Sequence, residues 1–239
     1  MKNKKVILIN IAVVSLSLLL VGVLLWVFRT PKQPKPEQIY TGSLKSVVEL
    51  RAQTEGVGDS YGTAVFLDDS GLLVTNAHVV TYSQLGERVA FDHYSIRFAA
   101  EDTYRDAALV RFDAKLDLAI LRLADTNCDF QPIPIGKIAS VKSGIRVYAV
   151  GNSLNHGISI SEGIVGVPRL EIAYENVVRT VIQCDLTIAE GNSGGALLNE
   201  EGKLIGITTF RAKDAAGNVV QGFAYCVPID IVMAYVSGT

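Results

Sequence analysis

The stretch "TAVFLDDSGLLVTNAHVV", residues 63–80, sets two apolar runs on either side of a short polar segment. The runs "TAVFL" and "LLVT" carry the β-branched and aromatic residues that favour strands. Between them, "DDSG" supplies the Asp and Gly that a hairpin turn requires. The stretch "LLNEEGKLIGI", residues 197–207, repeats this plan. We therefore predict a β-hairpin at both places.

Short apolar runs of this kind recur through residues 40–239, separated by clusters of Gly, Asp, Asn and Ser at intervals of roughly 8–12 residues. They do not alternate with amphipathic segments of helical length, so a doubly wound α/β sheet fits poorly. An all-β barrel or sandwich fits better. Besides residues 6–28, we expect helix only in one turn after "NAH" and in "IDIVMAYVS", which Pro228 introduces.

Residues 6–28, "VILINIAVVSLSLLLVGVLLWVF", contain no charged residue. In a helix with a rise of about 1.5 Å per residue, this length covers a hydrocarbon core of about 30 Å. We predict a transmembrane signal-anchor helix here, preceded by a cytoplasmic tail at residues 1–5. A cleaved signal peptide is disfavoured because its apolar stretch is shorter and ends at a small-x-small site. A buried core helix is disfavoured because no amphipathic stripe is visible.

The segment after the expected anchor is rich in proline: "TPKQPKPEQ", residues 30–38, has three prolines. Such a composition favours an extended, semi-rigid spacer. We therefore expect a linker at residues 29–39 and one globular domain at residues 40–239. A large domain after a lone N-terminal span is most simply exported. The expected location is the cell membrane, with a single pass and the domain on the extracytoplasmic side.

Charge and cysteine content exclude several classes of function. Six of the 22 basic residues lie in residues 1–35, which leaves 16 against all 24 acidic residues in residues 36–239. This acidic balance, without any basic cluster, makes nucleic acid an unfavourable partner. Cys128, Cys184 and Cys226 show no CxxC or Cys/His spacing, so no metal site is expected. We expect them to be small buried hydrophobic residues, with one disulfide between two of them as the alternative.

The segment "EGNSGG", residues 190–195, places Ser193 among glycines. A serine hydroxyl is a weak nucleophile, so it needs a neighbouring base and donors for the oxyanion that it generates. Glycines allow backbone conformations and close approaches that a side chain would forbid. The amides of Gly191, Asn192 and Ser193 could then converge on one oxygen and form an oxyanion hole. Taken alone, however, the segment also fits an ordinary turn.

A base must come from one of three histidines. His78 follows the apolar run "LLVT", so a strand delivers it to a domain edge or cleft. His93 and His156 lie in polar or loop segments and are expected at the surface. A histidine base works best when a carboxylate orients it, and the best candidate is Asp117 within "AKLDLAILRL". The alternative is that Asp117 lies on an edge strand and faces water, which strict alternation of the strand would also permit.

The order His78, Asp117, Ser193 in a turn-rich all-β chain resembles trypsin-like serine proteases of the HtrA/Deg type. The resemblance covers about residues 43–236. It rests on four blocks: "YGTAVFLDDSGLLVTNAHVV", "DLAILRL", "VYAVGNSLNHGISISEGIVG" and "VIQCDLTIAEGNSGGALLNEEGKLIGITT". It implies two six-stranded antiparallel β-barrels with the active site between them. It also implies that His78 is the general base, Asp117 its orienting carboxylate and Ser193 the nucleophile.

Three departures from the family pattern bear on regulation. The pattern usually continues into PDZ domains, whereas this chain stops after "VPIDIVMAYVSGT", so we expect no PDZ domain. Digestive relatives carry an aspartate before the serine that pairs with a new N-terminus; Asn192 cannot supply that ion pair, so zymogen activation of this kind is not expected. Glu190 stands where many HtrA-like sequences have proline.

The resemblance also bounds substrate preference. In this fold the residue six before the serine lies at the base of the primary specificity pocket, and here it is Thr187. The segment "GFAYCVP" would form a wall, with Ala224 and Tyr225 facing the pocket. Because these residues carry no negative charge, we expect a small or medium apolar side chain at the cleavage site rather than Lys or Arg.

The sequence therefore predicts a membrane-anchored serine endopeptidase that hydrolyses exported polypeptides through an acyl-enzyme, in protein quality control or regulated proteolysis. Such a mechanism needs no metal or cofactor. The main alternative is a catalytically weak, membrane-tethered peptide-binding or chaperone-like module on a protease fold. A structural anchor protein is a third, weaker one. A homotrimer is implied by the resemblance alone.

Overall fold

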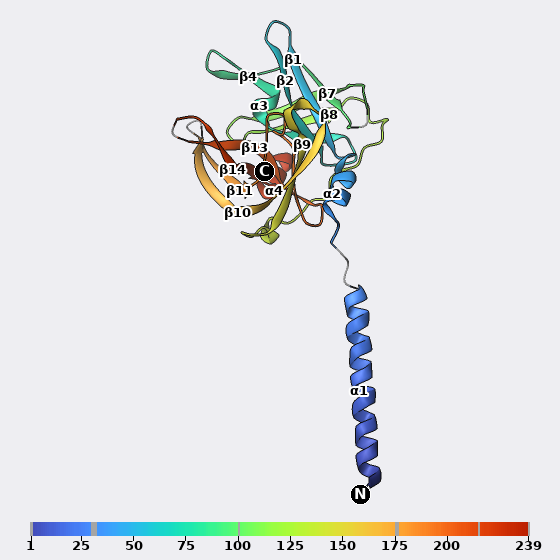
Figure 1. Ribbon diagram of the computed structural model, residues 1–239. Helices are drawn as coiled ribbons and strands as arrows, with labels where there is room; N and C mark the ends of the chain where they lie inside the picture. Colours follow the sequence, from blue (N-terminus) through green and yellow to red (C-terminus); the bar gives the residue numbers. More distant parts are fainter. Residues whose placement is uncertain (1, 30–32, 100, 175–176, 215, 239) are drawn as a thin grey trace. The chain divides into compact units, whose positions relative to one another are not determined.

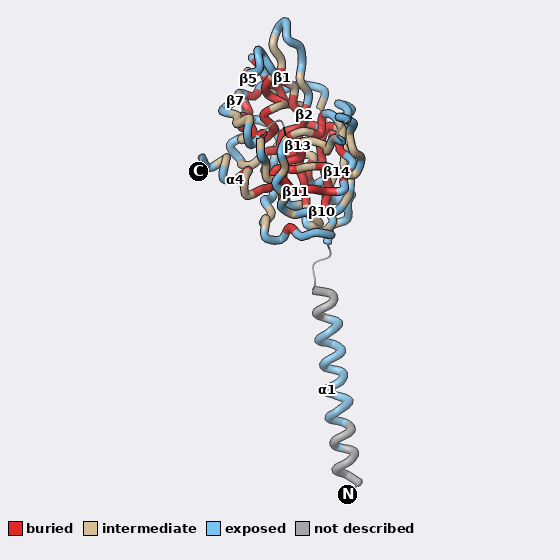
Figure 2. Tube along the Cα trace, turned by 90° about the vertical axis from the view of Figure 1, so that its left-hand side faces the viewer, coloured by how far each residue is buried: buried red, intermediate tan, exposed pale blue. Residues whose placement is uncertain are grey.

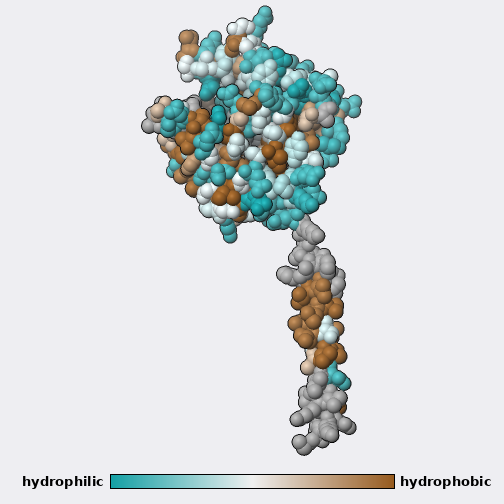
Figure 3. Space-filling model, viewed as in Figure 1, coloured by the Kyte–Doolittle hydropathy of each residue, from teal (hydrophilic) through white to brown (hydrophobic). Residues whose placement is uncertain are grey.

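The computed structural model describes residues 2–29, 33–99, 101–174, 177–214 and 216–238, which form two compact units, residues 1–33 and 34–239. The first unit contains helix α1 (Lys2–Arg29), whose described side chains are exposed and mostly apolar (Figure 3). Within the part of the chain that the structure describes, no helix combines the length and the apolar character that a bilayer crossing requires. Met1 of the expected tail and residues 30–32 of the expected linker lie outside the described residues.

The second unit is built around two closed six-stranded barrels (Figure 1). The first barrel has the strand order β1-β2-β3-β8-β7-β6 and the second the order β10-β11-β14-β13-β12-β9. Neighbouring strands in both are antiparallel. The all-β fold and the pair of barrels expected from the resemblance are thus confirmed.

The first barrel consists of β1 (Val47–Thr54), β2 (Gly58–Phe66), β3 (Leu72–Thr75), β6 (His93–Arg97), β7 (Arg105–Asp113) and β8 (Leu118–Leu123). Between β3 and β6 lie α3 (Ala77–Val80) and a two-stranded sheet of β4 (Thr81–Gln84) and β5 (Glu87–Ala90). The second barrel consists of β9 (Arg146–Asn152), β10 (Ile158–Tyr174), β11 (Val177–Asp185), β12 (Ala196–Asn199), β13 (Leu204–Lys213) and β14 (Val219–Pro228). The remaining elements are α2 (Pro36–Ser43), the 3-10 turns η1 (Ile138–Ser140) and η2 (Ser153–Asn155), and α4 (Ile229–Ser237).

The hairpin predicted at residues 63–80 is formed by β2 and β3, with Val65 opposite Val74. Asp68 closes its turn, because its Oδ1 accepts hydrogen bonds from the amides of Ser70 and Leu72 at 2.9 and 3.1 Å. Gly71 occupies the left-handed region at φ +78°, which a glycine adopts without strain. The second predicted hairpin is formed by β12 and β13.

Buried residues lie in the interior strands of the second unit, whereas its loops are mostly exposed (Figure 2). Alternation along the strands divides the buried side chains among three clusters. In β3, Leu73 points into the first barrel, whereas Val74 joins a cluster shared by both barrels. A third cluster fills the second barrel and includes Cys184 and Cys226. Successive strand residues face opposite sides of a sheet, so each apolar strand can serve two cores at once. Continuous apolar runs in this sequence therefore reflect burial on both faces.

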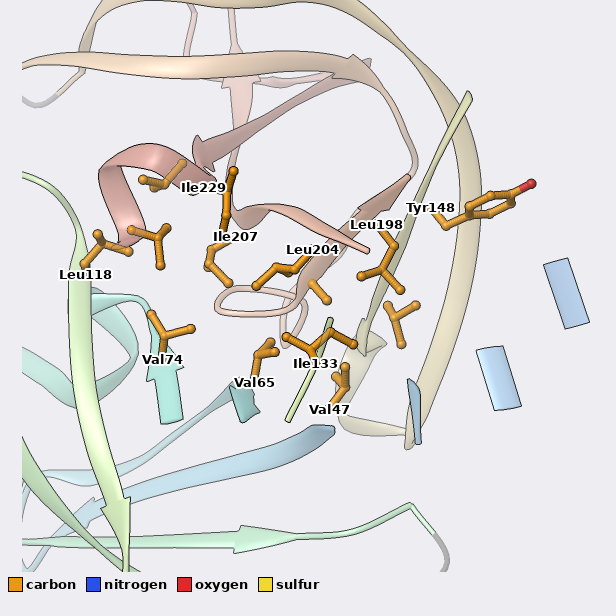
Figure 4. Packing of buried hydrophobic residues seen from close by; sticks show 14 of the residues in the cluster. Val47, Val65, Val74, Leu118, Ile133, Tyr148, Leu198, Leu204, Ile207 and Ile229 are labelled. Carbon is orange, nitrogen blue, oxygen red and sulfur yellow. The ribbon is translucent and has the colours of Figure 1, made fainter. Parts of the chain in front are cut away.

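The shared cluster fastens the two barrels together (Figure 4). Val65, Val74 and Leu118 come from the first barrel, and Leu204 and Ile207 from the second. All five are fully buried. Burying side chains of this size contributes roughly 1.5–3 kcal/mol each. This cluster therefore fixes the relative position of the barrels, and with it the site between them.

The helix predictions are partly confirmed. The single turn after "NAH" is α3, and the C-terminal stretch is α4. The prediction of an extended linker is wrong for residues 36–39, because these residues belong to α2, which begins at Pro36. Proline suits the first helical turn, where its missing amide proton has no partner to lose. Ile39 of α2 is buried in the cluster that the barrels share, which stabilises a helix of otherwise unremarkable sequence.

Candidate active site

His78 and Asp117 lie together on the face of the first barrel that meets the second. His78 sits in α3, directly after β3, as the sequence predicts. Its Nδ1 lies 2.9 Å from Asp117 Oδ2 and 3.0 Å from Oδ1, and its amide donates to Oδ1 at 3.1 Å. The carboxylate thus fixes the ring of His78 and favours the tautomer whose Nε2 is free to accept a proton.

Asp117 is only 3% exposed, so the alternative of an edge-strand aspartate facing water is wrong. It precedes β8 rather than lying within it, and its φ of +55° is left-handed, a region that Asp tolerates better than most residues. Asn76 Nδ2 donates to the carbonyl oxygen of Asp117 at 2.8 Å. Because Asp117 lies before the strand in a left-handed conformation, the alternation of β8 does not set the direction of its side chain. Sequence periodicity alone cannot reveal this.

The charge of Asp117 is stabilised from two barrels. Thr209 Oγ1, on β13, donates to Asp117 Oδ2 at 2.5 Å. Burial raises the pKa of this carboxyl, but attraction to His78 and the hydrogen bonds from His78 and Thr209 outweigh burial and hold the pKa below its ordinary value. Asp117 is therefore ionised at neutral pH. Thr209 was not predicted from the sequence, where it is one of two threonines in an apolar strand.

Ser193 and His78 both line a small cavity of about 160 Å³. Its Oγ donates to the carbonyl oxygen of Thr209 at 3.0 Å. Among the described residues it makes no hydrogen bond to His78 Nε2. The structure thus brings the three predicted catalytic residues to one place, with the serine hydroxyl turned toward β13.

Glycines let the loop around Ser193 pack against the first barrel. Gly194 has φ +84°, and a Cβ there would lie 2.1 Å from Thr63 O and 2.2 Å from Thr75 Oγ1. The amide of Thr63 donates to Ser193 O at 2.8 Å. The loop is therefore held directly against β2 and β3, and the space that a side chain would need is already filled.

The predicted oxyanion donors separate into two groups. The amide of Asn192 donates to Ala189 O at 3.2 Å and is already used in a turn. In the part of the chain that the structure describes, the amides of Gly191 and Ser193 have no acceptor. In this structure the amide of Asn192 is therefore engaged within the loop, whereas the amides of Gly191 and Ser193 are available to an oxyanion.

Asn192 is 4% exposed, and its Oδ1 accepts a hydrogen bond from Ser153 Oγ at 2.9 Å. Ser153 Oγ in turn accepts one from Ser159 Oγ at 2.8 Å. A chain of neutral hydrogen bonds thus anchors the position where digestive relatives carry an aspartate. This agrees with the expectation that Asn192 supplies no buried ion pair.

The predicted specificity residues do not line the cavity beside Ser193. Thr187 is exposed, and its carbonyl oxygen accepts a hydrogen bond from Ser161 Oγ at 2.9 Å. Ala224 is fully buried in the second barrel, and Tyr225 packs against Phe210 with ring centroids 5.4 Å apart. The cavity is instead lined by His78, Tyr174, Ile188, Ala189, Glu190, Ser193, Thr209, Phe210, Arg211 and Val219. Thr187, the sixth residue before Ser193, thus lies next to the lining residue Ile188 but does not itself line the cavity.

The remaining histidines lie at the surface, as expected: His93 is exposed and lies 3.5 Å from Asp106, and His156 is exposed after η2. Over the described ranges, no group of three or more His, Cys, Asp or Glu side chains is placed to hold a metal ion. The three cysteines are free, with Cys184 and Cys226 buried and Cys128 partly exposed. Among the described residues, the reactive side chains that lie together in one site are therefore those of His78, Asp117 and Ser193.

Comparison with known proteins agrees with this geometry. A family model described as "Trypsin-like peptidase domain" matches residues 62–207. The chain is 34% identical over 174 residues to the chloroplastic Protease Do-like 1 of Arabidopsis thaliana, covering 72% of this chain and 37% of that protein. It is 31% identical over 174 residues to Serine endoprotease DegS of Haemophilus influenzae, covering 72% and 48%. The solved structure "HtrA-type protease AlgW with tripeptide" has a TM-score of 0.71 and 26% identity, covering 85% and 63%.

The chain thus spans between about a third and a half of the length of these two curated relatives.

Proposed function

The chain belongs to the trypsin-like peptidases of the HtrA/Deg type, and from that premise we propose that it is a serine endopeptidase in which His78, Asp117 and Ser193 form the catalytic triad. The observation that carries the proposal is the buried, ionised Asp117 bonded to His78 Nδ1, with Ser193 and His78 lining the same cavity. A buried carboxylate is costly unless it is paired, and here its partner is the ring that a serine base requires.

The mechanism begins with rotation of the Ser193 hydroxyl from Thr209 O toward His78 Nε2, a hydrogen bond that free enzymes often form only with substrate bound. His78 then accepts the hydroxyl proton as Oγ attacks the substrate carbonyl. The amides of Gly191 and Ser193 hold the resulting oxyanion. His78 gives its proton to the leaving amine, and water hydrolyses the acyl-enzyme by the same steps.

Substrate preference for a small or medium apolar side chain is supported by the walls of the cavity. Ile188, Ala189, Phe210 and Val219 contribute apolar surface there. Cleavage profiling of a peptide library with the full-length protein tests this preference. Dominant cleavage after Lys or Arg would contradict it.

Anchoring in the membrane through residues 6–28, with the protease domain on the extracytoplasmic side, is part of the proposal. Its support is the charge-free sequence of this segment and the exposed apolar side chains of α1. Exported polypeptides would then be the substrates, in quality control or regulated proteolysis. A homotrimer is proposed from family membership alone. Protease digestion of sealed membrane vesicles of known orientation tests the topology: the domain should be degraded only in vesicles whose extracytoplasmic face is outside.

A second candidate is a peptide-binding module with little turnover, and the bond from Ser193 Oγ to Thr209 instead of His78 favours it. Labelling with a fluorophosphonate separates the two. Labelling of the wild-type protein but not of Ser193→Ala, together with casein hydrolysis that His78→Ala abolishes, supports the peptidase. Absence of labelling in folded, assembled protein favours the binding module.

A further inference from the structure

Arg179, in β11 of the second barrel, reaches the turn of the first barrel that carries Asp117. Its Nη2 donates a hydrogen bond to Ala114 O at 3.0 Å, and Ala114 lies three residues before Asp117. The side chain of Arg179 is only 10% exposed, so water competes little for this bond. The second barrel thus holds the turn from which the first barrel presents the carboxylate of the triad.

The guanidinium of Arg179 is itself held by two aromatic rings of the second barrel. It lies 5.5 Å from the centroid of Tyr174 and 5.8 Å from that of Phe210. The two rings stack on each other with centroids 4.0 Å apart. A planar, delocalised guanidinium suits both such stacking and burial. Phe210 directly follows Thr209 in β13. Arg179 therefore packs against the strand that also supplies a hydrogen bond to Asp117.

Arg179 also places its charge beside the carboxylate of Asp117. Its Nη1 lies 4.0 Å from Asp117 Oδ2, and the side chain of Asp117 is 5% exposed. This distance is too long for a hydrogen bond, but opposite charges attract across it more strongly in a buried site than in water. Oδ2 is also the oxygen that faces His78 Nδ1 and Thr209 Oγ1. Arg179 therefore attracts the oxygen that orients the ring of His78.

The turn before β8 requires support because its backbone at Asp117 is left-handed, with φ +55°. A non-glycine residue keeps such a conformation only where the surrounding contacts hold it. Within the first barrel, Asp113 Oδ1 accepts hydrogen bonds from the amides of the two residues before Asp117, at 2.8 and 3.0 Å. The bond from Arg179 to Ala114 O holds the same turn from the second barrel.

We propose that Arg179 is a positioning residue of the triad: it holds the turn and the carboxylate of Asp117 in the place where Asp117 orients His78. This rests on the proposed peptidase function. A neutral side chain would lose both the bond to Ala114 O and the charge beside Oδ2, so that Asp117 could move relative to the ring. Because Arg179 acts through Asp117 and not on the substrate, its loss should slow the chemical step and leave substrate binding nearly unchanged.

The test compares Arg179→Met, Arg179→Gln and Arg179→Lys in the full-length protein, with rates expressed per folded molecule. For a fluorogenic peptide, kcat should fall by about tenfold in the two neutral variants, with KM within about twofold of the wild-type value. Arg179→Lys keeps the charge and a donor, so kcat should fall by only about threefold. Arg146→Met removes an exposed arginine that pairs with Glu162 on the second barrel, and this matched control should leave both constants unchanged.

Proton NMR separates a positioning role from a purely structural one. The Nδ1 proton of His78, bonded to Asp117, should give a signal far downfield of other N–H protons. This signal should shift or broaden in the two neutral variants and persist in Arg179→Lys and Arg146→Met. Urea unfolding of the same samples reports stability, which a purely structural role would lower without changing the His78 signal of the folded protein.

The rate of fluorophosphonate labelling is measured on the same samples, because it reports the reactivity of Ser193 without a peptide. Folded neutral variants with the wild-type kcat, or with an unchanged His78 signal, overturn the inference and leave the peptidase intact. A KM that rises more than kcat falls also overturns it, because Arg179 would then contact the substrate. Failure of both neutral variants to fold, while Arg179→Lys folds, would assign Arg179 to the fold alone and overturn it too. Wild-type protein that is neither labelled nor active overturns the proposed function, and the inference with it.

Discussion

Replacing Thr209 by Val tests whether the two barrels jointly hold the charge of Asp117. The substitution keeps the size of the side chain and removes the hydroxyl that donates to Asp117 Oδ2 at 2.5 Å. A hydrogen bond to a charged group contributes about 1.5–3 kcal/mol, and Asp117 is too buried for water to replace the donor. We therefore expect the free energy of unfolding to fall by about 1.5–3 kcal/mol.

Loss of activity in Thr209→Val has an upper limit set by the same bond. If all of its energy served the transition state, kcat/KM would fall by about 10–100-fold, since about 1.4 kcal/mol corresponds to a factor of ten. The bond also exists in the free enzyme, so the measured loss should be smaller than this limit. Urea unfolding and hydrolysis of a fluorogenic peptide measure the two quantities, and Thr209→Ser, which keeps the donor, is the matched control.

The pH dependence of stability gives a third measurement. Because the folded pKa of Asp117 lies below its ordinary value near 3.8, its ionised form stabilises the fold above that pH, and this stability is lost as the pH falls through the folded pKa. Thr209→Val removes one cause of the lowered pKa, so acid unfolding should begin at a higher pH. Unchanged stability, acid unfolding and kcat/KM in this variant would refute the assigned role of Thr209.

Three further predictions follow from single contacts. Asp68→Ala removes the acceptor that closes the first hairpin turn and should cost about 1–2 kcal/mol in urea unfolding, with Asp68→Asn losing less. Gly194→Ala places a Cβ about 2 Å from two oxygen atoms at a residue with positive φ, so most of the soluble, folded protein should be lost. Circular dichroism measures this loss, and alanine at an open, exposed glycine is the control that should be tolerated. Ellman's reagent should label Cys128 in the native protein but Cys184 and Cys226 only after unfolding, because the latter two are fully buried. Rapid labelling of all three thiols in native protein would contradict this burial.

Those parts of the fold that depend on local chemistry could be predicted from the sequence. Alternation, turn residues and the Asp68–Gly71 segment predict the hairpin that carries His78. Helix α2 could not be found in this way, since "PEQIYTGS" has little helical preference of its own. It forms because Ile39 is buried between the barrels, and such a tertiary contact has no local signal in the sequence.

The residues of the candidate site also differ in whether the local sequence predicts them. His78 and Ser193 stand beside recognisable local patterns, a strand end and a glycine-rich loop. For Asp117, alternation permitted both burial and exposure, and the left-handed backbone before β8 decides between them. The cavity walls depend on how β13 lies against the loop before Ser193, and this tertiary arrangement has no local signal from which the sequence could show that Thr187, Ala224 and Tyr225 do not line this cavity.

Thr209 shows why some residues of a site between two barrels escape sequence analysis. It lies 92 residues from Asp117 and 16 from Ser193, and it contacts the first through its hydroxyl and the second through its backbone oxygen. A threonine in a strand is ordinary, so neither contact leaves a pattern in the sequence. Both contacts depend on the position of β13 relative to the first barrel, which the shared core of Val65, Val74 and Ile207 sets. The chemistry of this site therefore rests on the packing between the barrels as much as on the triad itself.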